Sequence, residues 1–247
     1  MIETIPVAAP PRTVAAALAE PWLLRQGLAP FGLRATVDQF AAGDDFVIEV
    51  FRWPVRLRVV QADEHGLLVT GPVRLQATVV PSGTGALLTC DVGRPVPLRV
   101  VRALLIAVRD RAEQLADAPV VVGAAIVADG SVLAAQRDRP PIAAGRWEFP
   151  GGKVEPGEDE RAALVRECKE ELAADVLVDD RLGPDLVLAN GWVLRLYLAR
   201  PAPGTEPVAT EHRALRWVAA DQLADVDWLP ADRIVLPGLR AALSPGR

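Results

Sequence analysis

Three glutamates in the second half of the chain have the type and spacing that phosphate chemistry needs. Glu167, Glu170 and Glu171 stand at i, i+3 and i+4, which places their carboxylates on one face of a helix. Like charges this close repel one another, so a fold keeps them where a positive charge lies between them. Hard oxygen ligands of this kind suit Mg²⁺ or Mn²⁺. Because Mg²⁺ takes few protein ligands and completes its shell with substrate phosphates, the cluster indicates phosphate chemistry.

The cluster must be positioned by the elements of the second half, where strands alternate with two helices. A β-branched run over 120–127 predicts a buried strand, and after a tight turn at Asp129 and Gly130 its hairpin partner follows over 131–137. A helix is expected over 159–173, with acidic residues in its first turn. Further elements are expected as strands over 176–178, 192–199 and 214–218 and as a last helix after Pro237. Strands interspersed with two helices favour an α/β or α+β sandwich.

The first half has a different pattern, that of an antiparallel sheet. A strand over 2–7 is followed by a helix over 11–19 with proline at its start. A long amphipathic helix over 101–115 closes this half. Between the helices we expect strands over 46–51, 56–61, 66–70, 74–80 and 86–91. A short connector at 116–119 puts the boundary near residue 117, so the predicted domains are 1–117 and 118–247.

Bulk properties exclude several classes of protein. The chain has 247 residues, of which 51% are apolar, enough for two domains with their own cores. A net charge of −5 argues against a protein dedicated to a nucleic-acid polymer, which needs a basic face. We find no apolar run of about 18 residues and no signal-peptide pattern, so neither a membrane span nor secretion is expected. Two isolated cysteines, Cys90 and Cys168, fit a reduced cytoplasm, where we expect the protein to reside.

The segment Gly152–Ala174 resembles the Nudix box, G-x5-E-x7-R-E-U-x-E-E-x-G-U, in which U is a bulky aliphatic residue. Cys168 stands for the first aliphatic residue, and Ala173 replaces the second glycine. A residue after a helix often adopts the left-handed conformation, where a β-carbon costs roughly 1 kcal/mol, so this departure bears on the loop and not on the carboxylates. The matching positions are Gly152, Glu158, Arg166, Glu167, Glu170 and Glu171.

The wider region 120–243 looks like the MutT-type branch, most of all bacterial enzymes that act on CTP, dCTP and oxidised guanine nucleotides. The stretches that carry this likeness are 135–137, 146–153, 211–217 and 227–232. The first half more faintly resembles START-like helix-grip (SRPBCC) proteins, whose fold encloses an apolar cavity. Together they imply an α+β chain, a helix-grip antiparallel-sheet domain followed by a Nudix α/β/α sandwich domain.

The resemblance implies a divalent-metal centre. The Mg²⁺ or Mn²⁺ ligands would be Gly151, Glu167, Glu170, Glu171 and Glu211. Glu167 and Glu170 would also be catalytic, together with Arg166, which would orient a carboxylate, and Glu211, as a loop ligand or base. The alternative for the glutamates is a solvated acidic helix face, which the register with Gly152, Glu158 and Arg166 disfavours. For Glu211, an exposed loop glutamate is an equally open interpretation.

Four residues are candidates for substrate binding. Arg137 would meet a base carbonyl or a phosphate, Lys153 the phosphates, and Phe149 would stack on a base. Asp232 matches the family's base-reading position, where a carboxylate accepts from an exocyclic amine such as cytosine N4. For the other aromatic residues and the histidine of this half we favour packing roles. These residues are Trp192, Tyr197, Trp217, Trp228 and His212.

The sequence thus predicts a Mg²⁺-dependent nucleoside triphosphate pyrophosphohydrolase that yields a nucleoside monophosphate and pyrophosphate and removes mutagenic nucleotides from the pool. One alternative is hydrolysis of another nucleoside diphosphate derivative, such as ADP-ribose. Another is a non-catalytic sensor of nucleotides and apolar ligands. Trp22, Phe31, Phe46 and Trp53 either line a cavity for an apolar ligand in the first domain or, as we favour, form its core. Oligomeric state does not follow from the sequence.

Overall fold

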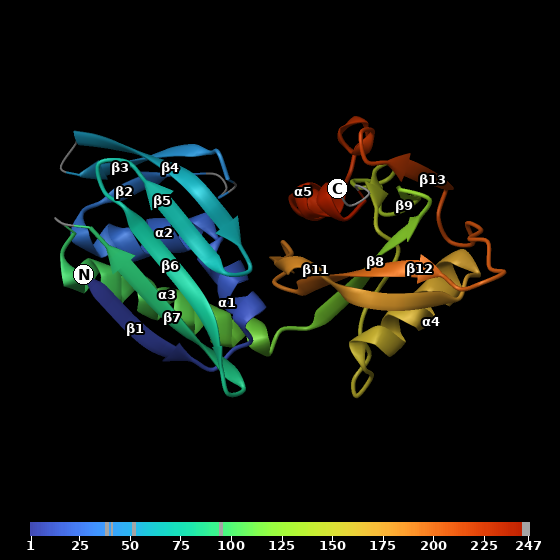
Figure 1. Cartoon of the computed structure of the whole chain (residues 1–247), viewed down its shortest axis with the longest axis horizontal. Coiled ribbons are helices and arrows are strands. Elements are labelled where there is room, and N and C mark those ends of the chain that lie inside the picture. The colour runs from blue at the N-terminus through green and yellow to red at the C-terminus, as the bar shows by residue number, and fades with distance from the viewer. Residues whose placement is uncertain (38–39, 41, 51–52, 94–95, 244–247) are drawn as a thin grey trace. The chain divides into compact units, whose positions relative to one another are not determined.

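A computed structural model describes residues 1–37, 40, 42–50, 53–93 and 96–243. The chain forms two compact units, Met1–Ala118 and Pro119–Arg247, each with its own sheet (Figure 1). No helix in these residues is long and apolar enough to cross a membrane. The chain is therefore an α+β protein built from two separately packed units.

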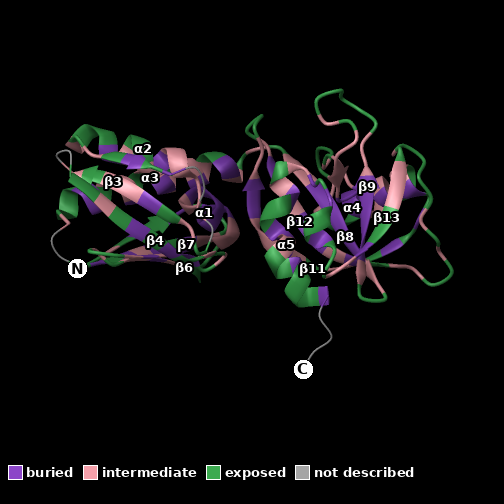
Figure 2. Ribbon diagram, turned by 90° about the horizontal axis from the view of Figure 1, so that it is seen from above, coloured by how far each residue is buried: buried purple, intermediate pink, exposed green. Residues whose placement is uncertain are grey.

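The first unit is a seven-stranded antiparallel sheet in the order β1-β7-β6-β5-β4-β3-β2. Three helices, α1 (Pro11–Leu18), α2 (Pro21–Leu28) and α3 (Leu98–Ala116), lie on one face of it (Figures 1 and 2). A short 3-10 turn, η1, covers Ala29–Phe31. The strands are β1 (Ile2–Val7), β2 (Arg34–Thr36), β3 (Asp45–Val50), β4 (Trp53–Asp63), β5 (Gly66–Thr70), β6 (Leu75–Ser82) and β7 (Gly85–Val92).

Alternation along the strands and helical spacing along α3 build the core of this unit. On β7 the inward residues Leu88 and Cys90 are buried, while Leu87 and Asp91 on the other face of the strand are exposed. The buried stripe of α3 is Val101, Leu105, Val108, Ala112 and Leu115. The helix-grip resemblance implies a strand, a short helix, an antiparallel sheet and a long last helix, in that order. The first unit has this order with one further short helix, α2, and its assignment to the helix-grip fold stays a prediction.

Four parts of the first unit differ from expectation or fall outside it. Neither α2 nor β2 was predicted: Gly27 weakens the helical pattern of α2, and β2 has only three residues. In the fold a β-carbon at Gly27 would lie 2.6 Å from Leu104 Cδ2, so glycine lets α2 pack closely on α3. Phe46 is buried as expected for a core residue, but Trp53 is 77% exposed and is not part of the core. Phe51, the end of one predicted strand, lies outside the described residues.

The second unit is a mixed sheet between two helices. Its strands run in the order β10-β9-β8-β12-β11, with β13 paired to β9. The pair β12–β8 is parallel and the other pairs are antiparallel. The elements are β8 (Val120–Ala128), β9 (Ser131–Gln136), β10 (Trp147–Glu148), α4 (Glu160–Leu172), β11 (Val176–Val187), β12 (Val193–Pro201), β13 (Ala214–Ala219), η2 (Leu223–Asp225) and α5 (Pro230–Leu243).

Alternate residues of β8 enter two different cores, one on each face of the sheet. Val122, Ala124 and Ile126 join the cluster that contains the buried residues of α4. Ala125 joins the cluster that contains Leu239 and the other buried residues of α5. A central strand buried on both faces accounts for its unbroken apolar run, and the two helices therefore cover opposite faces, as in a sandwich.

Two predicted boundaries in this unit were wrong. The last helix begins at Pro230, not after Pro237. Pro230 fits the first turn of a helix, because a backbone N–H there has no partner within the helix. The helix then continues through Pro237. Strand β11 runs to Val187, far beyond the predicted 176–178. Its register shifts between Val178 and Arg181 and between Leu182 and Leu186, and these irregularities break the alternation on which a sequence-based prediction depends.

Candidate active site

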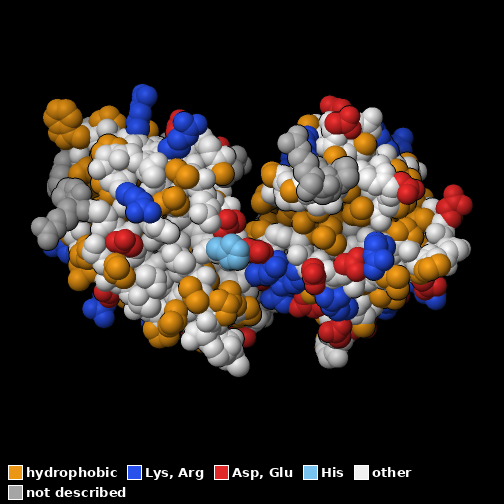
Figure 3. Space-filling model, in the orientation of Figure 1, with side chains coloured by type: hydrophobic (Ala, Val, Ile, Leu, Met, Phe, Trp, Pro, Cys, Tyr) orange, Lys and Arg blue, Asp and Glu red, His pale blue; other side chains and the backbone are white. Residues whose placement is uncertain are grey.

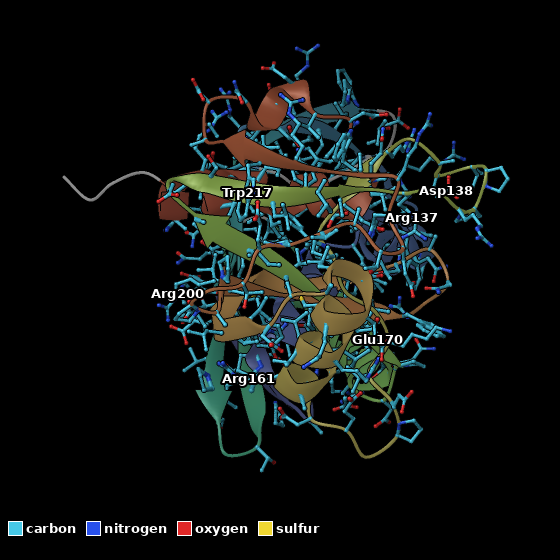
Figure 4. All side chains as sticks on the ribbon, turned by 90° about the vertical axis from the view of Figure 1, so that its right-hand side faces the viewer. Arg137, Asp138, Arg161, Glu170, Arg200 and Trp217 are labelled. Carbon is cyan, nitrogen blue, oxygen red and sulfur yellow. The ribbon has the colours of Figure 1, made fainter. Side chains whose placement is uncertain are left out.

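Helix α4 presents the glutamates because its opposite side is committed to the core. Asp159 caps the helix by accepting hydrogen bonds from the N–H groups of Arg161 and Ala162. Leu164 and Cys168 are fully buried under the sheet. Arg161 and Glu170 mark the two ends of α4 in Figure 4. The glutamates therefore leave the helix away from the core, toward the loop after β10.

The guanidinium of Arg166 joins the carboxylates. Its Nε lies 3.0 Å from Glu158 Oε1, and its Nη1 lies 2.8 Å from Glu167 Oε1 and 3.4 Å from Glu170 Oε2. Its Nη2 donates to the carbonyl of Lys153 at 3.0 Å. These bonds lower the pKa of Glu158 and raise that of Arg166. The expected orienting role of Arg166 thus has a geometric basis, since one side chain ties the helix to the loop.

The loop approaches the glutamates closely because it has two glycines. Gly151 N–H donates to Glu171 Oε2 at 2.9 Å, and a β-carbon at Gly151 would lie 2.1 Å from Val122 O. A β-carbon at Gly152 would lie 2.3 Å from the carboxylate carbon of Glu167. Both positions thus admit only glycine without displacement of their neighbours.

Ala173 keeps the conformation expected of the glycine it replaces. Its φ of 49° and ψ of 29° are left-handed, and its N–H bonds back to Cys168 O as the helix ends. Ala174 then turns inward and is fully buried. The departure from the box therefore leaves the helix end intact, at a conformational cost of about 1 kcal/mol.

Behind the loop, Glu171 and His212 belong to a buried polar cluster. Burial raises the pKa of Glu171 to about 7, against the opposing effects of His212 and the Gly151 N–H. His212 Nε2 lies 3.3 Å from Glu148 Oε1, and its side chain is 5% exposed. Burial lowers the pKa of His212, but the bond to Glu148 and the nearby carboxylates outweigh this and raise it. Arg137 pairs with the other oxygen of Glu148.

Asp232 extends the same cluster. It is 3% exposed in the first turn of α5 and accepts a hydrogen bond from the backbone N–H of Phe149. Burial, and then the charge of Glu148, raise the pKa of Asp232 to about 8. The shift favours the protonated form of Asp232, which can donate a hydrogen bond as well as accept one.

A cleft of about 630 Å³ brings several predicted residues together, a size usual for small-molecule sites. Arg137, Lys153, Glu167 and Glu171 all line it. Trp192, for which a packing role was favoured, lines it as well.

Phe149 does not offer the open face that base stacking requires. It is 5% exposed, and its ring centroid lies 4.9 Å from that of Trp228, which is fully buried. The expected stacking role of Phe149 is therefore corrected to a core role, because the short extended segment points this ring into the sandwich. Tyr197 is likewise buried and donates to Glu160, whereas Trp217 is 39% exposed.

The loop that carries Glu211 is fastened to the end of α4. Thr210 N–H donates to Glu171 O at 3.0 Å, and its hydroxyl bonds to Glu170 O. Glu211 itself is exposed. The structure thus brings the Glu211 segment beside the acidic end of the helix. Across the described residues no three acidic, histidine or cysteine side chains converge as metal ligands would. Glu158, Glu167 and Glu170 lie on Arg166, and Glu171 on the Gly151 N–H.

The sequence assigned no role to Glu148 and favoured a packing role for His212, yet both belong to this site. They meet across 64 positions of sequence, and a single glutamate or histidine carries no spacing pattern of its own. Charges of both signs lie close together on the face of this unit seen in Figure 3. The ion pairs of this unit include Lys169–Asp175 and Arg200–Asp179.

Comparison with known proteins agrees with this geometry. The NUDIX domain model matches residues 117–239. The chain is 56% identical over 117 residues to a putative 8-oxo-dGTP diphosphatase 2 of Mycobacterium tuberculosis, a match that covers 46% of this chain and 82% of that protein. It is 38% identical over 123 residues to the CTP pyrophosphohydrolase of Escherichia coli, a match that covers 49% of this chain and 90% of that protein.

A solved MutT Nudix hydrolase from Burkholderia pseudomallei is 39% identical, with a TM-score of 0.44 over 50% of this chain and 98% of that one. The chain belongs to the Nudix hydrolase family. It is therefore an enzyme whose hydrolase domain is the second unit.

Proposed function

We propose that the second unit is a divalent-metal-dependent nucleoside triphosphate pyrophosphohydrolase. Its substrates would be CTP, dCTP, their modified forms or 8-oxo-dGTP, and its role the removal of mutagenic nucleotides from the cytoplasmic pool. The observation that carries the proposal is the fit of the α4 carboxylates against the loop, where Gly151 N–H donates to Glu171 and a side chain at Gly152 would displace Glu167. The names of the two relatives support the choice of substrates.

The donor set fits Mg²⁺ or Mn²⁺. It consists of carboxylate oxygens around a glycine loop that admits no β-carbon. When bound, the ion offsets phosphate charge and lowers the pKa of an attacking water. The residues that would hold it are Gly151, Glu167, Glu170, Glu171 and Glu211. Arg166 would orient Glu158 and Glu167 throughout, because its hydrogen bonds reach both at 3.0 Å or less.

Recognition of the substrate would use groups at two depths. At the surface, Lys153 and Arg137 would bind phosphate oxygens. Deeper, Asp232 would read the base by accepting a hydrogen bond from an exocyclic amine, and its protonated form would also donate to the ring nitrogen beside that amine, such as cytosine N3. Cytosine and 8-oxoguanine each carry an exocyclic amine, so one residue would serve either base.

The test is pyrophosphate release from CTP, dCTP, 5-methyl-dCTP, 8-oxo-dGTP, dGTP and ADP-ribose, with Mg²⁺ and with EDTA. We expect Mg²⁺-dependent turnover of one or two triphosphates that is lost in Glu170→Gln. Because the Glu170 side chain is 54% exposed, this variant should fold normally, which circular dichroism would check. Turnover of ADP-ribose alone would show that the substrates are nucleoside diphosphate derivatives and not nucleoside triphosphates. No turnover at all would reject the proposal in favour of a sensor with an apolar ligand in the first unit.

A further inference from the structure

We propose that the ring of Trp192 is the surface on which the nucleobase or its ribose stacks, and that Lys153 covers this ring until a polyphosphate draws its ammonium away. This inference rests on the proposed function, because it places the two ends of a nucleotide in the cleft beside α4. It assigns to Trp192 the role that the burial of Phe149 leaves unfilled.

The backbone of Trp192 is held in place beside the cleft. It ends the turn between β11 and β12, where Leu188 N–H donates to Trp192 O at 2.8 Å and Trp192 N–H donates to Asn190 Oδ1 at 3.1 Å. Its side chain is half-buried and lines the cleft that Glu167 and Glu171 also line. Among the described residues around this cleft, Trp192 is the aromatic one.

Lys153 stands directly over that ring. Its Nζ lies 4.7 Å from the centroid of the Trp192 ring, within the range of a cation–π interaction. Its backbone is held by Arg166, which donates to its carbonyl, and by a β-bridge to Val121. The backbone of Lys153 is therefore fixed while its long side chain, which is exposed, remains free to turn.

The charges of the cleft make Lys153 the cation that a polyphosphate can recruit at least cost. Arg137 is paired with Glu148, and Arg166 is shared among three glutamates. No ion pair joins Lys153 to a carboxylate anywhere in the part of the chain that the structure describes. A cation–π contact at an exposed site is weak, whereas a lysine–phosphate hydrogen bond is charge-assisted. Phosphate binding would thus uncover the ring that receives the base or the ribose.

The first experiment separates the two ends of the nucleotide. Inorganic tripolyphosphate has phosphates and no base, so we compare its inhibition constant with the KM of the preferred triphosphate. Trp192→Leu should raise the KM roughly 10-fold and change the tripolyphosphate constant by less than about 2-fold. Trp192→Phe keeps an aromatic face and should therefore raise the KM by a smaller factor than Trp192→Leu does. The matched control is Trp217→Leu, an exposed tryptophan on β13, which should leave both constants unchanged.

Lys153→Met should weaken both ligands, because it removes the recruited cation. The stacking role would be overturned if Trp192→Leu left the KM unchanged, or if it weakened the affinities for tripolyphosphate and for the nucleotide by the same factor. Tripolyphosphate alone should change the tryptophan emission of the wild type and not that of Trp192→Phe. An identical change in both would overturn the exchange of Lys153 between ring and phosphate.

Binding measured by calorimetry distinguishes failure of this inference from failure of the proposed function. A protein that hydrolyses no triphosphate but binds a nucleotide more tightly than tripolyphosphate, with the difference lost in Trp192→Leu, retains the stacking role without the reaction. If the protein hydrolyses a triphosphate and Trp192→Leu still binds the nucleotide more tightly than tripolyphosphate, the proposed reaction stands and the stacking role does not. A protein that binds neither ligand contradicts both.

Discussion

The carboxylate of Glu167 occupies the space that a side chain at Gly152 would need. The Glu167 carboxylate carbon lies 2.3 Å from the ideal β-carbon position of Gly152, and both of its oxygens lie 2.4 Å away. Backbone atoms of the loop therefore form the surface against which this predicted ligand rests, and the shape of the loop sets the position of the carboxylate.

Gly152→Ala should consequently impair catalysis more than folding. A shift of Glu167 by about 1 Å is expected to lower kcat about 100-fold. The matched control is Gly238→Ala in α5, where the new β-carbon would lie 3.9 Å from Leu182 Cδ1, an ordinary contact. Steady-state kinetics beside circular dichroism would check this, and full activity in Gly152→Ala would contradict the role assigned to the loop.

Arg166→Gln should destabilise the second unit. It removes the charge shared by Glu158, Glu167 and Glu170 and leaves three neighbouring carboxylates repelling one another, two of them largely buried. We expect a loss of about 1–3 kcal/mol in the free energy of unfolding, measured in urea. Arg200→Gln breaks an exposed, solvent-screened pair with Asp179 and should change the free energy of unfolding far less. Equal losses in the two variants would show that the Arg166 network adds nothing beyond a surface pair.

Ala173→Gly should stabilise the protein. The left-handed φ of 49° strains alanine and not glycine, so the expected gain is about 1 kcal/mol. Ala162 is an exposed residue of α4, and Ala162→Gly should instead lower the free energy of unfolding by about 1 kcal/mol. Thermal unfolding of the two variants should therefore shift in opposite directions, and a loss of stability in Ala173→Gly would argue against a left-handed residue at this point.

Stability should fall with rising pH, in part because of Asp232. The pKa of Asp232 rises from 3.8 when unfolded to about 8 when folded, so the folded state holds the proton that the unfolded state has released. The stability that this proton gives is complete below pH 4 and is lost progressively up to about pH 8. Glu171 acts in the same direction.

Unfolding of Asp232→Asn at pH 5, 7 and 9 tests this, because asparagine keeps the shape and cannot ionise. The loss of stability between pH 5 and 9 should be smaller than in the wild type. Asp227→Asn, which alters an exposed carboxylate paired with Arg233, should retain the wild-type dependence. An Asp232→Asn protein with the wild-type pH dependence would show that Asp232 is ionised when folded.

The sequence was sufficient for features that recur at fixed spacing. The glutamates of α4 follow helical spacing, and the run over 120–127 identifies a strand buried on both faces. It was insufficient where position depends on partners far along the chain. Phe149 belongs to a short extended segment with no periodicity, and its burial against Trp228 follows from the docking of α5 and the preceding turn. His212 meets Glu148 only once β10 and the loop before β13 are assembled.

The loop after β10 is bonded to β8 as a neighbouring strand would be. Val122 N–H donates to Gly152 O, Ala124 N–H to Pro150 O and Val154 N–H to Val120 O, each at 3.0 Å or less. These amide hydrogens can therefore exchange with solvent only when the middle of the sheet opens, among the slowest events in a folded domain. A substrate bound at this loop would meet a backbone held in the sheet, so we expect a change of substrate preference to arise from the side chains around the loop.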